Sequence, residues 1–156
     1  FNTTIASSGL KEEPDKPRPE TNLPDLSLGS LLNYNQLSLI AHCANEAQLF
    51  TTPVNAGILR SLLEGTLHQP LKSANNRLVA FFFDRLCHHR LILGRWEHLL
   101  EQAGSILGSR DDCPLKHGQY SSALSLAKSN PNSMQEVISQ CVQAVREMTE
   151  RNTTDN

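Results

Sequence analysis

The chain has 156 residues, enough for one domain with a buried core and too few for two domains joined by a linker. Its formal net charge is -2, with only 19% charged residues, which excludes a global positive field that would draw the whole molecule onto nucleic acid or an anionic membrane. Its apolar runs fall far short of the roughly 20 residues that a membrane-spanning helix needs, so we expect no membrane partner.

Residues 1–27 are predicted to form a disordered tail or linker. Four prolines, at positions 14, 17, 19 and 24, are interspersed with charged side chains, and few apolar residues are present to offset the entropy cost of ordering the backbone. The sequence therefore predicts a domain over 28–150, behind this tail and ahead of a disordered C-terminus at 151–156.

Two helices are expected first in this domain. Asn33 followed by Gln36 forms a capping-box pattern that predicts a helix running to about Leu49. Thr52 before Pro53 is typical of an N-cap with a first-turn proline, and it predicts a short second helix that ends at Gly65.

The third predicted helix is expected to be the centre of the fold. Ser73 is its predicted N-cap, and its apolar side chains form so broad a surface that helices on several sides must cover it; they are Leu78, Val79, Phe81, Phe82, Phe83 and Leu86. Phe82 and Leu86 are four residues apart and thus share the face predicted to lie deepest.

Three more helices are predicted after a short apolar hinge. They cover about 96–103, 120–128 and 133–150, the last with a capping box formed by Ser133 and Glu136. A short β-ribbon near 90–95 remains an alternative to a simple hinge. The sequence predicts an all-α fold, a compact orthogonal array of about five to six helices.

Thiols and imidazoles are the candidate metal ligands in the sequence. Cys87-His88-His89, His42-Cys43 and Cys113 with His117 offer the ligand types that zinc prefers, but no two short-spaced pairs of ligands are present. We therefore predict no metal site and no cofactor. The four cysteines are widely separated rather than densely spaced, which favours free thiols and a cytoplasmic location.

Catalytic motifs are also missing from the sequence. It contains no Gly-x-Ser-x-Gly elbow and no glycine-rich phosphate loop, and its paired acids are typical of solvated helix faces and loops. We expect the protein not to be an enzyme.

A DNA-associated regulatory domain of the winged helix-turn-helix type is the alternative function. A short helix, a turn, a long helix and a hinge follow one another in the required order. The predicted contacts with duplex DNA are Asn75, Asn76, Arg77, Arg85, Arg90 and Arg95. A basic face shared by the four arginines would favour this function.

Three short patterns resemble, loosely, small helical regions in proteins from mobile elements of gut bacteria. They are Asn-Gln-Leu-x-x-Ile-Ala from Asn35, Asn75-Asn76-Arg77-Leu78, and Arg95-Trp96-Glu97. The resemblance names no family and implies no catalytic residue, and it adds weight only to the DNA alternative.

The first hypothesis is a non-enzymatic helical interaction module with a protein partner, because capped amphipathic helices are abundant while convergent polar chemistry is absent. The sequence does not indicate an oligomeric state.

Overall fold

The computed structural model describes residues 26–30 and 32–155, with side chains to residue 148. The tail predicted for 1–27 lies almost entirely outside these residues. The described part is mostly α-helical, which confirms the predicted fold class. Its helices are α3 (Tyr34–Glu46), α4 (Ala56–Glu64), α5 (Asn76–His88), α6 (Trp96–Ala103), α7 (His117–Ser129) and α8 (Ser133–Asp155), with two short strands, β1 (Leu71–Lys72) and β2 (Ile106–Leu107).

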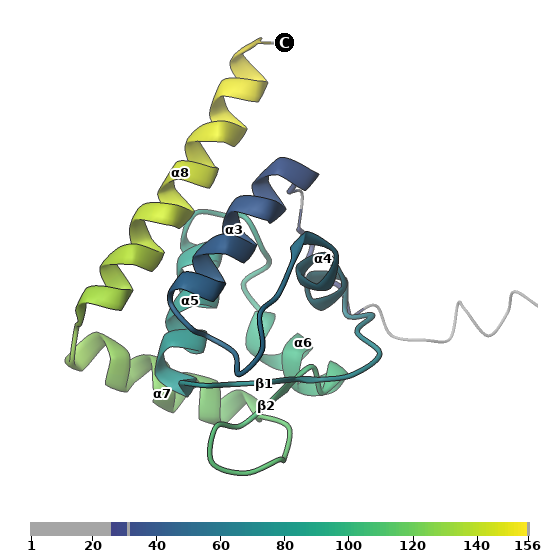
Figure 1. Cartoon of the computed structure of the whole chain (residues 1–156), viewed down its shortest axis with the longest axis vertical. Coiled ribbons are helices and arrows are strands. Elements are labelled where there is room, and N and C mark those ends of the chain that lie inside the picture. Colours follow the sequence, from purple (N-terminus) through teal and green to yellow (C-terminus); the bar gives the residue numbers. More distant parts are fainter. Residues whose placement is uncertain (1–25, 31, 156) are drawn as a thin grey trace, which may run out of the picture.

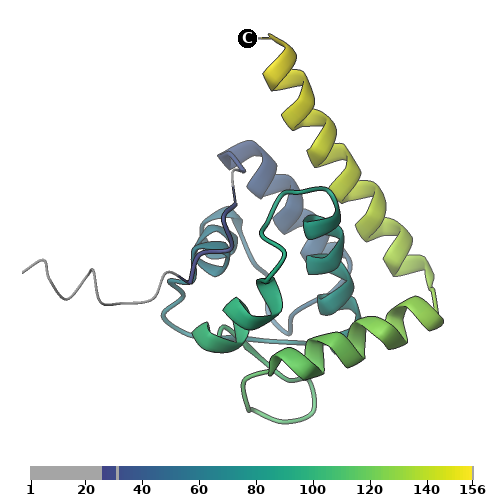
Figure 2. The same cartoon turned by 180° about the vertical axis from the view of Figure 1, so that it is seen from behind.

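Helix α5 lies in the middle of the array. It packs against α7 and α8, while α3 packs against α8 and α4, and α6 packs against α7 (Figure 1). Seen from behind, α7 crosses below α5 and then turns sharply into α8, which rises along the other side of the domain (Figure 2). The N-terminal end of α5 thus lies close to α7 and the strands.

The centre of the core is the apolar face of α5, as predicted. Phe82 and Leu86 are both 0% exposed. Phe82 meets Phe83 edge to face with ring centroids 5.3 Å apart, and Phe83 stacks on Trp96 at 5.6 Å. These ring contacts join α5 to α6.

Helix caps match the sequence patterns in part. The predicted capping box of Asn33 and Gln36 is present at α3, and Gly65 ends α4 in the left-handed conformation. The N-cap predicted at Ser73 is wrong: Asn75 caps α5, because the Ser73 N–H donates to the Leu107 carbonyl and its side chain is buried. The N-cap of α4 is likewise Asn55 rather than Thr52.

The β-ribbon considered near 90–95 does not form. The Leu91 N–H donates to the Leu86 carbonyl, which ends α5 in a turn. The Leu93 N–H donates to the Leu28 carbonyl, so this segment lies beside the residues that precede α3. The sheet pairs β1 with β2 instead, in parallel, with Leu71 opposite Ile106. Leu91 and Ile92 are buried in the core, and this burial rather than strand pairing accounts for the apolar pattern of the segment.

The backbone of α8 continues to Asp155, past the domain boundary expected at residue 150 and into the predicted disordered segment 151–156. In both views its last turns extend beyond the body of the domain (Figures 1 and 2). Among the described residues, no helix is long and apolar enough to cross a bilayer.

Candidate functional site: a basic pocket at the start of α5 and α7

The arginines predicted to contact DNA do not gather on one face. Arg77 lies in the first turn of α5, whereas Arg90 follows the other end of the same helix. A helix of this length is about 20 Å long. Arg85 is half-buried, pairs with Asp84 at 3.0 Å and lies over the Phe81 ring at 5.5 Å.

Helix α5 also lacks the free side that a DNA-reading helix needs. A recognition helix must insert one face into the major groove, yet α7 and α8 pack against α5 and most of its apolar side chains are buried. Arg95 precedes α6 as an exposed residue of the turn. Within residues 32–155 the strand that follows α5 is the two-residue β2, which pairs in parallel with β1 and does not form the hairpin of a wing.

Three of the predicted DNA contacts do meet at one place. Asn75, Asn76 and Arg77 line an open pocket of about 860 Å³, together with Ser109, Arg110 and residues 116–119. The first turn of α5 forms one wall, the loop after β2 forms a second, and α7 from its start to Leu126 forms the third. Half of the predicted DNA contacts thus line this pocket, whereas the other three do not; these are Arg85, Arg90 and Arg95.

The pocket is basic. Arg77, Arg110 and Lys116 belong to its lining, and no carboxylate side chain does. Arg77 and Lys116 are exposed, as is Arg110, and within the described part of the chain none of the three has an ion-pair partner. The three cations produce a local positive potential around one concavity although the whole chain is slightly acidic. The Glu101 carboxylate, which interacts electrostatically with Lys116, reduces this potential at one edge.

A network of hydrogen bonds holds the loop that carries Arg110. The Lys72 ammonium group donates to the carbonyls of Gly108 (2.6 Å) and Asp111 (2.7 Å) and pairs with the Asp112 carboxylate at 3.1 Å. From the other side, the Asn76 side-chain oxygen accepts from the Ser109 N–H at 3.1 Å. Arg110 is therefore presented from a fixed loop.

The N-terminus of α5 adds to the positive potential. The helix dipole places about half a positive elementary charge at an N-terminus, and α5 begins at the pocket. The N-terminus of α7 also borders the pocket, but the Glu101 carboxylate accepts its first N–H and offsets that charge. The Asn75 side-chain oxygen accepts from the N–H groups of Arg77 and Leu78, so it satisfies part of the first turn of α5. Helix α5 therefore contributes to the positive potential of the pocket mainly through its dipole, because two of its first N–H groups already donate to Asn75.

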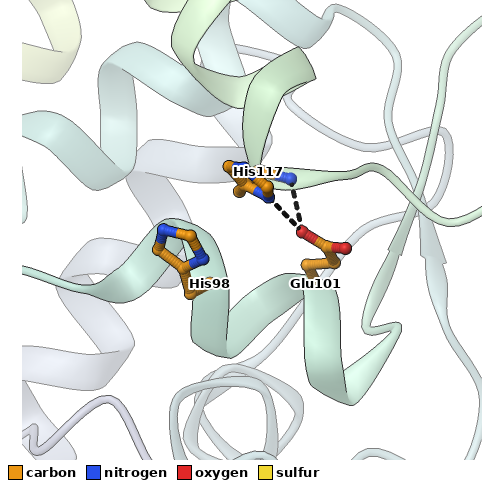
Figure 3. A group of neighbouring side chains, drawn as sticks. All are labelled: His98, Glu101 and His117. Atoms are coloured by element: carbon orange, nitrogen blue, oxygen red, sulfur yellow. Dashed lines mark hydrogen bonds and ion pairs between the residues drawn. The ribbon is translucent and has the colours of Figure 1, made fainter.

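A second polar cluster lies beside this pocket, between α6 and α7. His98 and Glu101 project from one face of α6 toward His117, the first residue of α7 (Figure 3). One Glu101 carboxylate oxygen (Oε1) accepts from the His117 backbone N–H at 2.8 Å and lies 2.6 Å from its Nδ1. The His98 and His117 rings stack with centroids 4.3 Å apart.

Glu101 supplies the N-terminal cap of α7. No side-chain cap comes from Lys116 at the N-cap position, and the Glu101 carboxylate from α6 accepts the first N–H instead. The hydrogen bonds from the backbone and side chain of His117 favour the ionised form and hold the pKa of Glu101 below its usual value. Ser121, one turn further along α7, donates to Glu97, one turn earlier on α6, at 3.1 Å. This hydrogen bond joins the same two helices.

His98, Glu101 and His117 form the one group of three potential metal ligands among the described residues, with all ligand atoms within 4.8 Å of one another. The groups weighed from the sequence do not form such a cluster there. Cys43 is buried, and the neighbouring Cys141 thiol donates to the Leu39 carbonyl at 3.6 Å. Burial raises the pKa of the half-buried Cys87 thiol. The spacing of His98 and Glu101 is visible in the sequence, but the approach of His117 depends on the fold.

Comparison of the chain with protein-family models, with curated proteins and with solved structures finds no match. The loose resemblance to helical regions of mobile-element proteins gains no support from these comparisons. What the protein does must therefore be argued from its own residues.

Proposed function

We propose that the protein is a non-enzymatic interaction module and that the basic pocket binds an acidic segment of a partner protein. The observation that carries the proposal is the convergence of Arg77, Arg110 and Lys116 on one open pocket without a neutralising carboxylate in its lining. Partly exposed cations on fixed elements are suited to hold carboxylates by charge and hydrogen bonds, and they set specificity and association rate.

The distribution of charge around the pocket favours a short acidic segment over a long polyanion. Asp111 and Asp112 are exposed directly beside Arg110, and the Asp112 side chain is 82% exposed. A nucleic acid strand running across the pocket would meet these carboxylates, whereas affinity for nucleic acid comes largely from many phosphate contacts along a basic surface. A peptide can place its carboxylates in the pocket and avoid the loop.

The pocket lining fits binding better than catalysis. Its polar groups are amides, cations and the hydroxyls of Ser109 and Ser122, and neither hydroxyl hydrogen-bonds to a base among the described residues. Nucleophilic catalysis would need such a pair. His117 borders the pocket, but its Nδ1 is engaged by Glu101.

Fluorescence anisotropy with a labelled ten-residue glutamate peptide tests the proposal. The wild-type chain is expected to bind saturably, and binding is expected to weaken as salt is raised, because exposed charge pairs are screened. Arg77→Ala and Arg110→Ala should each weaken binding about 1.4- to five-fold, since an exposed ion pair contributes about 0.2–1 kcal/mol. Arg110→Glu should weaken it further.

Arg90→Ala is the matched control, because Arg90 is also exposed but lies beyond the opposite end of α5. It should bind the peptide like the wild type. Equal losses for Arg90→Ala and Arg77→Ala would show that binding follows overall charge and would contradict a pocket. Tighter binding of a labelled 20-base-pair duplex than of the peptide, lost in Arg77→Ala, would assign the pocket to nucleic acid instead.

A further inference from the structure

We propose that His98, Glu101 and His117 form a binding site for a Zn²⁺ ion that joins α6 to α7. The site shares His117 with the lining of the basic pocket, but its other two ligands lie on α6 outside that lining, and the proposal does not depend on binding of an acidic segment. Two imidazoles and one carboxylate are a ligand set that zinc accepts, with the remaining coordination positions left to water or to another ligand.

The backbone already places the three groups together. His98 and Glu101 are three residues apart on α6, so their side chains lie on the same face of the helix. His117 begins α7, and its backbone N–H is held by the Glu101 carboxylate at 2.8 Å. Figure 3 shows that the two α6 side chains reach toward the start of α7. The ligands therefore come from fixed helices rather than from mobile loops.

The distances require only small side-chain movements. The three ligand atoms lie within 4.8 Å of one another, and ligands at about 2.0–2.2 Å from a tetrahedral zinc ion are about 3–4 Å apart. Rotations that move the ends of these side chains by about an ångström would close the site. The His98 and His117 side chains are exposed, so an ion can reach them from solvent.

Two features change when an ion binds. The 2.6 Å contact between Glu101 Oε1 and His117 Nδ1 must open if these two atoms coordinate the ion, because ligands of one tetrahedral zinc ion are about 3–4 Å apart. The two imidazole rings are now stacked with an angle of 24° between their planes, whereas a metal ion lies in the plane of each ring that coordinates it. One ring must therefore turn about its side-chain bonds. His98 can do so readily, because it is exposed and its ring contact with His117 is its one interaction among the described residues.

The cluster also has a purely structural explanation, in which Glu101 and His117 cap α7 and no ion binds. His98 separates the two explanations. It takes no part in the hydrogen bonds between Glu101 and His117, so a helix cap does not need it, whereas a three-ligand site does.

The test is isothermal titration of the tag-free full chain with Zn²⁺, after treatment with EDTA and dialysis. The wild type should bind one Zn²⁺ per chain, and its thermal midpoint should rise with zinc concentration, because an ion that binds only the folded chain stabilises it. His98→Ala should lose both effects while keeping the thermal midpoint of the metal-free wild type within about 2 °C, as expected for an exposed substitution.

The double variant His88→Ala/His89→Ala is the matched control. It removes two histidines whose rings lie 5.2 Å apart but which have no third ligand nearby in the described structure. This variant should bind zinc like the wild type. Zinc binding that persists in His98→Ala, or no saturable binding by the wild type, would overturn the proposal and leave the cluster as a helix cap.

Discussion

Truncation of Phe82 to alanine should be strongly destabilising. The Phe82 side chain is 0% exposed and contacts the ring of Phe83. Burial of a Phe side chain contributes about 1.5–3 kcal/mol, and an aromatic pair adds about 0.5–1.5 kcal/mol. With a term for the remaining cavity, the total approaches the about 3–5 kcal/mol that Phe→Ala substitutions in cores typically cost.

Chemical denaturation followed by circular dichroism measures this loss directly. In a thermal scan the midpoint should fall by roughly 6–20 °C, given about 2–4 °C per kcal/mol for a domain of this size. Phe81→Ala is the matched control: Phe81 is only half-buried, under the Arg85 guanidinium, so its loss should cost less than half as much. If both substitutions cost the same, α5 is not the central helix and the fold described here is incorrect.

Four further substitutions or reactions test individual contacts. Tyr120→Phe should leave the free energy of unfolding unchanged or raise it by about 1 kcal/mol, because the buried Tyr120 hydroxyl has no hydrogen-bond partner in the described structure; a clear loss in urea denaturation would reveal a partner. Asn75→Ala should cost about 1 kcal/mol in the same assay through loss of the α5 cap, and no loss would argue against that cap. Gly65→Ala should cost on the order of 1–2 kcal/mol or more, since φ is +74° and a Cβ would lie 2.6 Å from a backbone oxygen; a neutral result would mean that α4 ends elsewhere. With a thiol reagent at pH 8, exposed Cys113 should react first and buried Cys43 last, because the neighbouring Cys141 and burial raise the pKa of the Cys43 thiol; Cys113→Ser should remove the fast phase.

Local patterns predicted much of the fold because the helices have strong signals of their own. The Asn33 and Gln36 capping box, the stop at Gly65 and the buried face of α5 follow from spacing and side-chain chemistry alone. The N-cap of α5 was misplaced because Ser73 and Asn75 are both good caps. Only the pairing of Ser73 with Leu107 across the sheet decides between them.

The candidate sites depend on contacts between distant parts of the chain, which sequence spacing does not reveal. Arg110 joins Arg77 because Lys72 and Asn76 hold its loop against the start of α5. His117 meets Glu101 because the Gln119 side chain of α7 accepts only from the Lys116 N–H, and the His117 N–H takes its acceptor from α6. The sequence singles out Arg77 at the start of α5 as a binding residue, but it does not single out Arg110 and Lys116, which lie across the pocket from it.

Chemical-shift mapping tests the central claim most directly. A ¹⁵N-labelled sample would be titrated with the ten-residue glutamate peptide and followed by ¹H–¹⁵N correlation spectra. The account predicts that the largest shifts occur at the amides of residues 75–78, 109–110 and 116–119, which border the pocket. The amides of α4, on another part of the domain, should stay in place. Shifts concentrated in α4 or along α8, or no shifts at peptide concentrations that saturate the anisotropy signal, would contradict the assignment of the pocket as the binding site.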